Sequence, residues 1–353
     1  MNLRHVYGKT YVAEATTALI PIYKLNDRDV VLFDTGYAKL DRSGLTNLLE
    51  ENGLHPRGVI CSHAHFDHTG NVHYLQQRYG TLAAAQIIEA GISVNPDAYR
   101  ANYVALTYGK SREIFLEECF IADAIIPADA DHLDFCGECF GILQLPGHSA
   151  GHIGIVTPDG VAYLGDCLID QGQIDAAKLP TSMFIERDLE SKRSLRTLRA
   201  PAYILAHKAV VTDLSALIDS NIAFLLQKSA EMLDCLTDGM TFADWIYTFC
   251  RREQVRTKNE LKFSVVERNF DNFVDWLVDT GRVEVRREFC AKHYYRVGGN
   301  DGVISSDGDF AALCASAGYA SLRRSLRAGN FSTYTPPRKP DQTLFMACEP
   351  RTR

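Results

Sequence analysis

The sequence predicts an α/β protein in which two β-sheets pack face to face with helices outside, followed by a mostly helical C-terminal domain. Between residues 10 and 206, short apolar runs rich in β-branched residues alternate twice with segments of helical period. After Thr212 the helical period takes over. A chain of 353 residues is also long enough for two domains, or for one large domain with an addition.

The first half of the α/β part supplies one group of strands and helices. The predicted elements are, in order, two or three strands within residues 10–35, a helix at 43–52, a strand at 58–62, and helices at 71–79 and 82–90. Gly53 is a typical stop signal for the first of these helices. Residues 99–107 and 113–118 mix aromatic and polar side chains, and their pattern predicts no definite element.

The second half of this part returns to strands. The predicted elements are strands at 124–127, 133–145, 152–157 and 161–164, a helix at 189–198, and a last strand at 202–206. The helix carries a basic run of Lys192, Arg193, Arg196 and Arg199. We interpret this run as a solvent-facing surface and not as a track for phosphate groups.

The C-terminal part reads as helices followed by a hairpin. The predicted elements are helices at 215–236, 241–251 and 265–279, and hairpin strands at 282–287 and 290–297. Thr241 with Asp244 three residues later is a typical helix start. Aromatic residues such as Trp245 and Phe270 recur at helical spacing, which favours packing in a core over stacking on nucleic-acid bases. This order of elements resembles a winged-helix module.

Residues 61–71 carry the densest chemistry of the chain. They read Cys-Ser-His-Ala-His-Phe-Asp-His-Thr-Gly-Asn, which places His63, His65, Asp67 and His68 in the pattern H-x-H-x-D-H directly after a predicted strand. His63 and His65 can point the same way from an extended backbone, while Asp67 and His68 turn with the chain. Imidazoles and a carboxylate at this density suit zinc, which takes nitrogen and oxygen ligands.

This window closely resembles the signature of the metallo-β-lactamase superfamily, and later segments resemble the rest of its site. Leu-Pro-Gly-His-Ser-Ala-Gly-His at 145–152 offers His148, Tyr-Leu-Gly-Asp at 163–166 offers Asp166, and Tyr-Ile-Leu-Ala-His-Lys at 203–208 offers His207. The lysine after His207 is bulkier than the small residue usual in this family. The resemblance covers residues 1–235 and implies the αβ/βα sandwich of that family.

The resemblance also implies a role for each residue. One metal would be held by His63, His65 and His148, a second by Asp67, His68 and His207, with Asp166 bridging the two. Asp34, in Val-Val-Leu-Phe-Asp-Thr-Gly, and His152 would support the site without binding metal. The expected cofactors are two zinc ions, and the ligand types leave iron or manganese open.

Two such metals, roughly 3.5–4 Å apart, can share a hydroxide formed near neutral pH. We expect this hydroxide to attack the carbonyl of a thioester, lactone or similar ester, as in glyoxalase II-like relatives. Asp67 is the expected catalytic residue, because its free oxygen can orient the hydroxide or accept a proton. The alternative is a phosphodiesterase or ribonuclease of the same fold.

Charge favours a small-molecule substrate. Residues 1–239 hold 19 Lys and Arg against 30 Asp and Glu, a net of −11, while residues 240–297 hold 11 against 9, a net of +2. An acidic catalytic part disfavours a polyanion, and a weakly basic C-terminal part disfavours nucleic acid without excluding it. We therefore expect the C-terminal module to pack against the catalytic domain and narrow its cleft.

The predicted domains are a metallo-β-lactamase-fold catalytic domain at 1–212, a connecting helix at 213–239, a winged-helix-like domain at 240–297 and a polar, partly disordered tail at 298–353. The sequence has no run of 18 apolar residues, no signal-peptide pattern at its start and ten scattered cysteines. These features predict a cytoplasmic protein that does not bind membranes, and they leave a homo-oligomer open.

Overall fold

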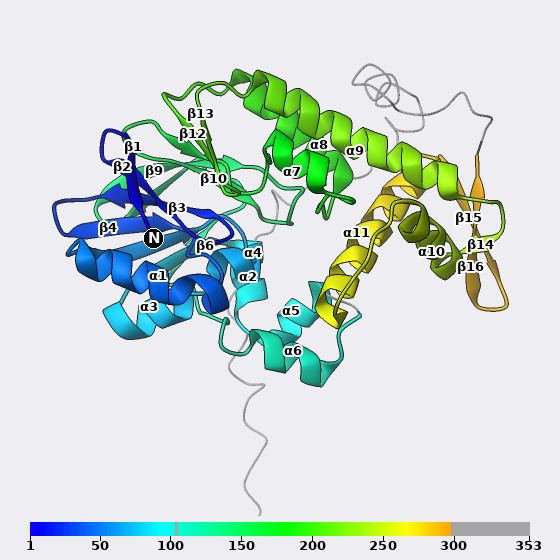
Figure 1. Cartoon of the computed structure of the whole chain (residues 1–353), viewed down its shortest axis with the longest axis horizontal. Helices are drawn as coiled ribbons and strands as arrows, with labels where there is room; N and C mark the ends of the chain where they lie inside the picture. Colours follow the sequence, from blue (N-terminus) through cyan, green and yellow to red (C-terminus); the bar gives the residue numbers. More distant parts are fainter. Residues whose placement is uncertain (103–104, 298–353) are drawn as a thin grey trace, which may run out of the picture. The chain divides into compact units, whose positions relative to one another are not determined.

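The computed structural model describes residues 1–102 and 105–297, which form two large β-sheets, flanking helices and a small third sheet (Figure 1). All of these residues belong to one compact unit, and the domain boundaries drawn from the sequence stay predictions. The predicted tail at 298–353 lies outside the described residues.

The first sheet contains seven strands in chain order. They are β1 (Leu3–Tyr7), β2 (Thr10–Glu14), β3 (Leu19–Lys24), β4 (Asp29–Phe33), β5 (His55–Cys61), β6 (Leu82–Gln86) and β7 (Ala124–Ile126). β1 to β4 pair antiparallel, and β4 to β7 pair parallel. Parallel neighbours need crossover connections, which α1 (Ala38–Glu51) and α3 (Val72–Tyr79) supply.

The central strand β4 is buried on both faces. Val31 and Phe33 point into the cluster between the two large sheets, and Val30 and Leu32 point into the cluster beneath the helices. Side chains alternate between faces along a strand, so one apolar run serves both clusters. Val-Val-Leu-Phe is therefore a core strand of a layered fold.

The second large sheet has the order β13-β12-β11-β10-β9-β8. Its strands are β8 (His132–Phe135), β9 (Glu138–Gln144), β10 (Ile153–Val156), β11 (Ala162–Tyr163), β12 (Tyr203–Leu205) and β13 (Ala209–Val211). Phe140, Tyr163 and Ile204 from this sheet meet Phe33 and Ile60 from the first in one buried cluster. The predicted arrangement of two sheets flanked by helices is confirmed.

The helix predicted at 82–90 is wrong in its first half. Residues Leu82–Gln86 form strand β6, and only Ile87–Ser93 form a helix, α4. Alanine favours helices intrinsically, but Ala83, Ala84 and Ala85 are fully buried between β5 and β7. Backbone pairing on both sides of this segment outweighs a propensity difference of less than about 1 kcal/mol per residue.

Several short elements, among them β1, β13 and α7 (Gln171–Ala176), were not predicted from the sequence. β1 and β13 are edge strands, and α7 is a single short helix whose residues are not buried. The strand predicted at 202–206 is therefore not the last of its sheet, because β13 follows it. Short elements with little buried surface leave little periodicity to detect.

The C-terminal part contains helices and a small sheet. Its elements are α9 (Ser215–Cys235), β14 (Met240–Thr241), α10 (Phe242–Arg252), α11 (Glu260–Asp279), β15 (Val283–Glu288) and β16 (Ala291–Arg296), with sheet order β14-β16-β15. Thr241 and Asp244 form the predicted capping box, and Trp245, Phe249 and Phe270 are buried as predicted. The finer winged-helix assignment stays a prediction.

The remaining helices include α2 (Phe66–Thr69), α5 (Pro96–Asn102), α6 (Tyr108–Phe115) and α8 (Ile185–Ser194). None of the helices in the described ranges combines the length and the apolar character that crossing a membrane requires.

A buried carboxylate follows α6. Glu118 is 4% exposed, and its Oε2 atom has no hydrogen-bond partner among the described residues. Burial raises the pKa of Glu118 to about 8, although Lys39 and Arg42 oppose the shift and Asp67 and Glu117 add to it. The folded protein therefore keeps this proton at neutral pH, whereas the unfolded chain loses it.

We expect Glu118→Gln to stabilise the protein at pH 8 by on the order of 1–3 kcal/mol and to change its stability little at pH 4.5. Between these pH values the unfolded chain releases the Glu118 proton while the folded chain keeps it, so Glu118 makes the wild type less stable as the pH rises, and glutamine removes this contribution. Urea unfolding of chelator-treated protein measures both values. The exposed Glu113→Gln on α6 is the control, and an equal effect of Glu118→Gln at both pH values would contradict the prediction.

Candidate metal centre

The candidate ligands lie where strands end. Asp34 follows β4, and Ser62 and His63 follow its parallel neighbour β5. In the second sheet, the parallel strands β11 and β12 are followed by Asp166 and His207. Parallel strands finish at the same edge of a sheet, so side chains distant in sequence come together there.

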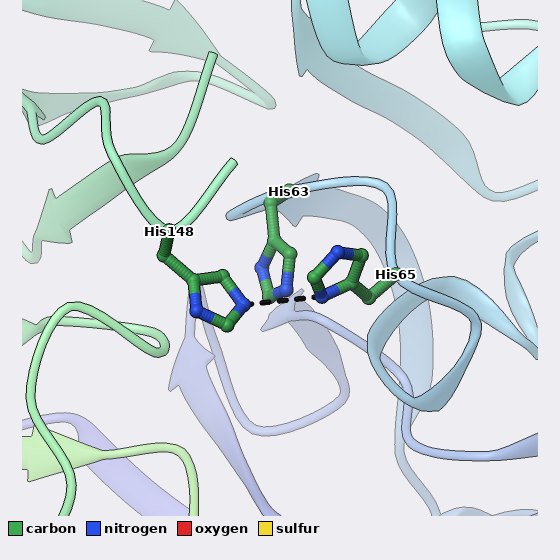
Figure 2. A group of neighbouring side chains, drawn as sticks. All are labelled: His63, His65 and His148. Carbon is green, nitrogen blue, oxygen red and sulfur yellow. Dashed lines mark hydrogen bonds between the residues drawn. The ribbon is translucent and has the colours of Figure 1, made fainter. Parts of the chain in front are cut away.

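His63, His65 and His148 form the first close group (Figure 2). Their ligand-capable nitrogen atoms all lie within 4.8 Å of one another, and all three imidazoles point toward a common centre. His65 Nδ1 and His148 Nε2 are 3.1 Å apart. His148 comes from the loop between β9 and β10, so this group joins the two large sheets.

Asp67, His68 and His207 form a second group, again with ligand atoms within 4.8 Å of one another. Asp166 lies beside both groups. Its carboxylate oxygens are 3.4 Å from His68 Nε2, 3.2 Å from His207 Nε2 and 3.4 Å from His148 Nε2. All seven residues predicted as ligands are thus brought together, and Asp166 contacts a histidine of each group.

The donor atoms fit a metal. Within the described residues, His63 Nε2, His68 Nε2 and Asp166 Oδ1 are buried and have no hydrogen-bond partner. A buried polar atom without a partner costs roughly 1–3 kcal/mol. Three such atoms in one place fit a bound metal that takes nitrogen and oxygen ligands, as zinc does.

The imidazoles of the first group are held neutral. Burial and the neighbouring imidazoles lower the pKa values of His63 and His65 well below the ordinary value. Burial likewise lowers the pKa of His148 to about 3, against a partial opposing effect of Asp166. Metal ions bind neutral imidazole, so this environment prepares all three rings for coordination.

The second group is held by opposite charges. Burial lowers the pKa of His68, but Asp166 and Asp34 together raise it well above its ordinary value. Asp166 raises the pKa of His207 to about 9. Burial raises the pKa of Asp166, yet the three surrounding imidazoles bring it well below its ordinary value. The low pKa of Asp166 keeps its carboxylate ionised, which is the form that binds a metal.

Asp34 forms four hydrogen bonds beside the candidate ligands. Its carboxylate accepts hydrogen bonds from the Ser62 backbone N–H at 2.7 Å, the Ser62 hydroxyl at 2.6 Å, His68 Nδ1 at 2.8 Å and the Tyr163 hydroxyl at 2.6 Å. The bond to His68 Nδ1 leaves its Nε2 facing Asp166. Asp34 also lies close to His63 and His68 as a third group, but these four bonds already occupy its oxygens.

His152 holds the backbone of Asp166. Its Nε2 accepts a hydrogen bond of 3.0 Å from the Asp166 N–H, and burial lowers its pKa to about 3, so the ring is neutral. Gly165 has a φ of +50°, and a Cβ there would lie 2.6 Å from His152 Nε2. The Gly-Asp turn therefore needs glycine both for its backbone conformation and for this contact.

Glu89 is a supporting residue that the sequence analysis missed. It is 1% exposed and accepts hydrogen bonds from Ala64 N–H at 2.8 Å, the Ser149 hydroxyl at 2.8 Å and Gly151 N–H at 2.6 Å. It therefore connects the loop of His63 and His65 with the loop of His148. A glutamate within a predicted helix gives no sign of this role, because its partners are fixed only by the fold.

We expect Glu89→Gln to destabilise the protein by about 2–4 kcal/mol, since the amide NH₂ group faces donors where the carboxylate accepted. The same change should loosen the first histidine group and weaken metal retention. Denaturant unfolding and metal content after dialysis measure the two effects. The exposed Glu113→Gln is the matched control. Unchanged metal retention in Glu89→Gln would show that the hydrogen bonds of Glu89 do not hold the metal-binding histidines in place.

A cavity of about 380 Å³ opens beside the second group. Its lining includes His148, Asp166 and His207 and the apolar side chains of Ile169, Leu179, Phe224 and Leu225. Lys192 also lines it, which corrects the prediction that this lysine belongs to a solvent-facing surface. Lys192 is 5% exposed and pairs with the buried Asp188 one helical turn earlier on α8. That carboxylate allows the ammonium group to be buried.

Comparison with known proteins gives one family match. Residues 22–207 match the model described as Metallo-beta-lactamase superfamily. Hydroxyacylglutathione hydrolase 1 of Vibrio vulnificus is 27% identical over 146 residues, which are 40% of this chain and 47% of that protein. Hydroxyacylglutathione hydrolase GloC of Haemophilus influenzae is 28% identical over 159 residues, which are 44% of this chain and 68% of that protein. The chain spans about half of the length of the Vibrio relative.

Two solved structures have a similar fold. A metallo-beta-lactamase family protein from Thermus thermophilus has a TM-score of 0.62 at 18% identity, covering 84% of this chain and 98% of that chain. A beta-lactamase domain protein from Burkholderia ambifaria has a TM-score of 0.61 at 15% identity, covering 84% and 95%. This coverage exceeds what residues 1–239 supply, so the shared fold extends into the C-terminal part.

Proposed function

Because the chain belongs to the metallo-β-lactamase superfamily, we propose that it is a metal-dependent hydrolase that cleaves a thioester, lactone or similar ester of a small molecule. It has the hydrolase fold of that family, with the His and Asp metal-binding groups intact. The proposed cofactors are two zinc ions.

In this proposal His63, His65 and His148 hold one metal, Asp67, His68 and His207 hold the other, and Asp166 is shared. When bound, the metals would activate water at neutral pH and polarise the attacked carbonyl. Asp34 and His152 orient His68 and Asp166 through their hydrogen bonds. The free oxygen of Asp67 can take up the proton that the attacking water loses.

The observation that carries the carbonyl proposal is the cavity beside Asp166. Its volume of about 380 Å³ lies in the range of small-molecule sites. Apolar side chains such as Phe224 and Leu225 suit an acyl group, and among the described residues that line it Lys192 is the only lysine or arginine. Asp188 neutralises that lysine, so the cavity offers no row of cations for a phosphate chain.

The names of the relatives favour the thioester class, since hydroxyacylglutathione is a thioester. A phosphodiesterase or ribonuclease is the second candidate, because the same metal-binding groups can serve attack at phosphorus. In that case the C-terminal part, which we propose is winged-helix-like, would be the nucleic-acid contact. A net charge of only +2 over residues 240–297 argues against this alternative without excluding it. A small-molecule partner and a cytoplasmic location are part of the first proposal.

The test is metal analysis together with a substrate comparison. We expect mass spectrometry of the purified protein to find two metals per chain, mainly zinc, and thioesters or lactones to be cleaved faster than phosphodiesters or RNA. One iron per chain with negligible zinc would contradict the cofactor proposal. Faster turnover of RNA or of a phosphodiester than of every thioester and lactone would replace the first function by the second.

A further inference from the structure

Helix α11 of the C-terminal part contacts the segment that holds a proposed metal ligand. On one face of this helix, Asn269 Nδ2 donates to Thr181 Oγ1 at 3.3 Å and Asn272 Nδ2 donates to the Ser182 carbonyl at 2.9 Å. Asn269 is 3% exposed. Two buried or half-buried amides on the same helix therefore bind two consecutive residues of the catalytic part.

The contact of α11 is anchored by apolar packing. Leu261 and Val265, in the first half of the helix, pack against the buried cluster of Tyr99, Leu106 and Phe115. Phe66, which lies between the ligands His65 and Asp67, packs against the same cluster. Arg268 adds a hydrogen bond of 3.3 Å to the Asn102 carbonyl. These contacts fix the register of the helix, so the two asparagines face residues 181–182 consistently.

Thr181 in turn forms a hydrogen bond with His148, the proposed metal ligand. Its backbone carbonyl lies 3.0 Å from His148 Nδ1. A carbonyl can only accept, so Nδ1 carries the hydrogen and Nε2 keeps the lone pair that faces His65 and Asp166. The same segment is tied to the residue before the ligand, because Met183 N–H and Phe184 N–H both donate to the Gly147 carbonyl, at 2.7 and 3.0 Å.

We propose that Asn269 and Asn272 are positioning residues for the metal site: by holding the segment of Thr181 and Ser182 they fix the orientation of His148, so that the C-terminal part controls the affinity of one of the two metals. The inference rests on the proposed role of His148 as a ligand. It gives α11 a function beyond packing, and it predicts a selective effect, because His207, His68 and Asp67 receive no hydrogen bond from these asparagines among the described contacts.

The test uses Asn269→Leu, Asn272→Leu and the double variant of the full chain, with Asp275→Asn, an exposed position on α11, as control. Zinc affinity is measured by competition with a chelator, and cobalt spectra report the geometry at the ligands. We expect the zinc affinity of one of the two sites to fall about tenfold in the double variant, while the other site keeps its affinity. Loss of a residue that orients a metal ligand typically lowers metal affinity by about 10- to 100-fold.

Thr181→Val provides an independent route, since it removes the side-chain acceptor from the catalytic side and keeps the backbone carbonyl that binds His148. Combined with Asn269→Leu it should cost no more than either change alone, because both break the same bond. It also keeps the proposal testable if the asparagine variants do not fold.

Two outcomes separate the inference from the function on which it rests. Wild-type protein that binds no metal would refute the proposed metal centre. Wild-type protein that binds two metals, with both affinities unchanged in folded asparagine and Thr181 variants, would refute the positioning role alone. Equal weakening of both sites would also refute it, because a general loss of stability does not select one metal.

Discussion

Replacing Asp67 by alanine should lower turnover at least about 10³-fold while the protein remains folded. The substitution removes a proposed ligand and a proton acceptor together, and a positioned acid or base alone is worth about 10²–10⁴-fold. The side chain is half-buried in the first turn of α2 and lies within 4.8 Å of the ligand nitrogens of His68 and His207. Few packing contacts are lost, so stability should change little.

The measurement is kcat for the best substrate, with metal content and thermal unfolding of each variant. His207→Ala should empty the second site and also abolish turnover, since it leaves Asp67 and His68 without their third partner. Asp97→Ala is the control, because Asp97 is an exposed aspartate in the first turn of the short helix α5. If His207→Ala keeps two metals and full activity, the Ala-His-Lys segment does not supply a ligand.

Asp34→Ala should have the largest effect on stability, about 3–5 kcal/mol, with loss of metal at the second site. The Asp34 carboxylate accepts four hydrogen bonds from Ser62, His68 and Tyr163, and its removal leaves those buried donors unpaired. Removing one partner of a buried charged group commonly costs this much. Alanine also fits poorly at the φ of +59° that Asp34 adopts.

Asp34→Asn separates the loss of hydrogen bonds from the backbone strain. Asparagine tolerates the left-handed backbone, but its NH₂ group cannot accept the hydrogen bonds that one carboxylate oxygen accepts. We expect its stability to fall between those of the wild type and Asp34→Ala in urea unfolding of the metal-free proteins. The exposed Asp129→Ala is the control. If Asp34→Ala lowered the free energy of unfolding by less than about 1 kcal/mol, the hydrogen bonds of this carboxylate would not be the main support of Ser62, His68 and Tyr163.

Four residues of the candidate site could be proposed from the sequence because their information is local. His63, His65, Asp67 and His68 lie within six positions of one another, and side-chain chemistry at that spacing points to a metal without knowledge of the fold. His148, Asp166 and His207 lie after or between apolar strands, and the resemblance to a known pattern supplied their roles. The geometry brings them together, with all ligand atoms of each triad within 4.8 Å.

The strands and helices that bury a regular face were predicted for the same reason. The apolar run of β4 and the capping box at Thr241 and Asp244 are patterns of neighbouring residues, which set local structure directly. Residues 82–86 were misread because their alanines carry a helical preference of their own. Their pairing with β5 and β7 is a contact with distant residues that no local pattern records.

The amino-acid sequence by itself determined the local H-x-H-x-D-H cluster, the layered α/β architecture and the helical C-terminal part, because each depends on residue type at short spacing. Only the tertiary structure decided that Glu89 joins two loops of the site, that Lys192 is buried beside Asp188, and that Asn269 reaches Thr181. Each of these is a hydrogen bond or ion pair whose geometry must be good to a few tenths of an ångström. That geometry depends on how whole helices and strands pack, and the sequence around either residue of a pair does not indicate the contact.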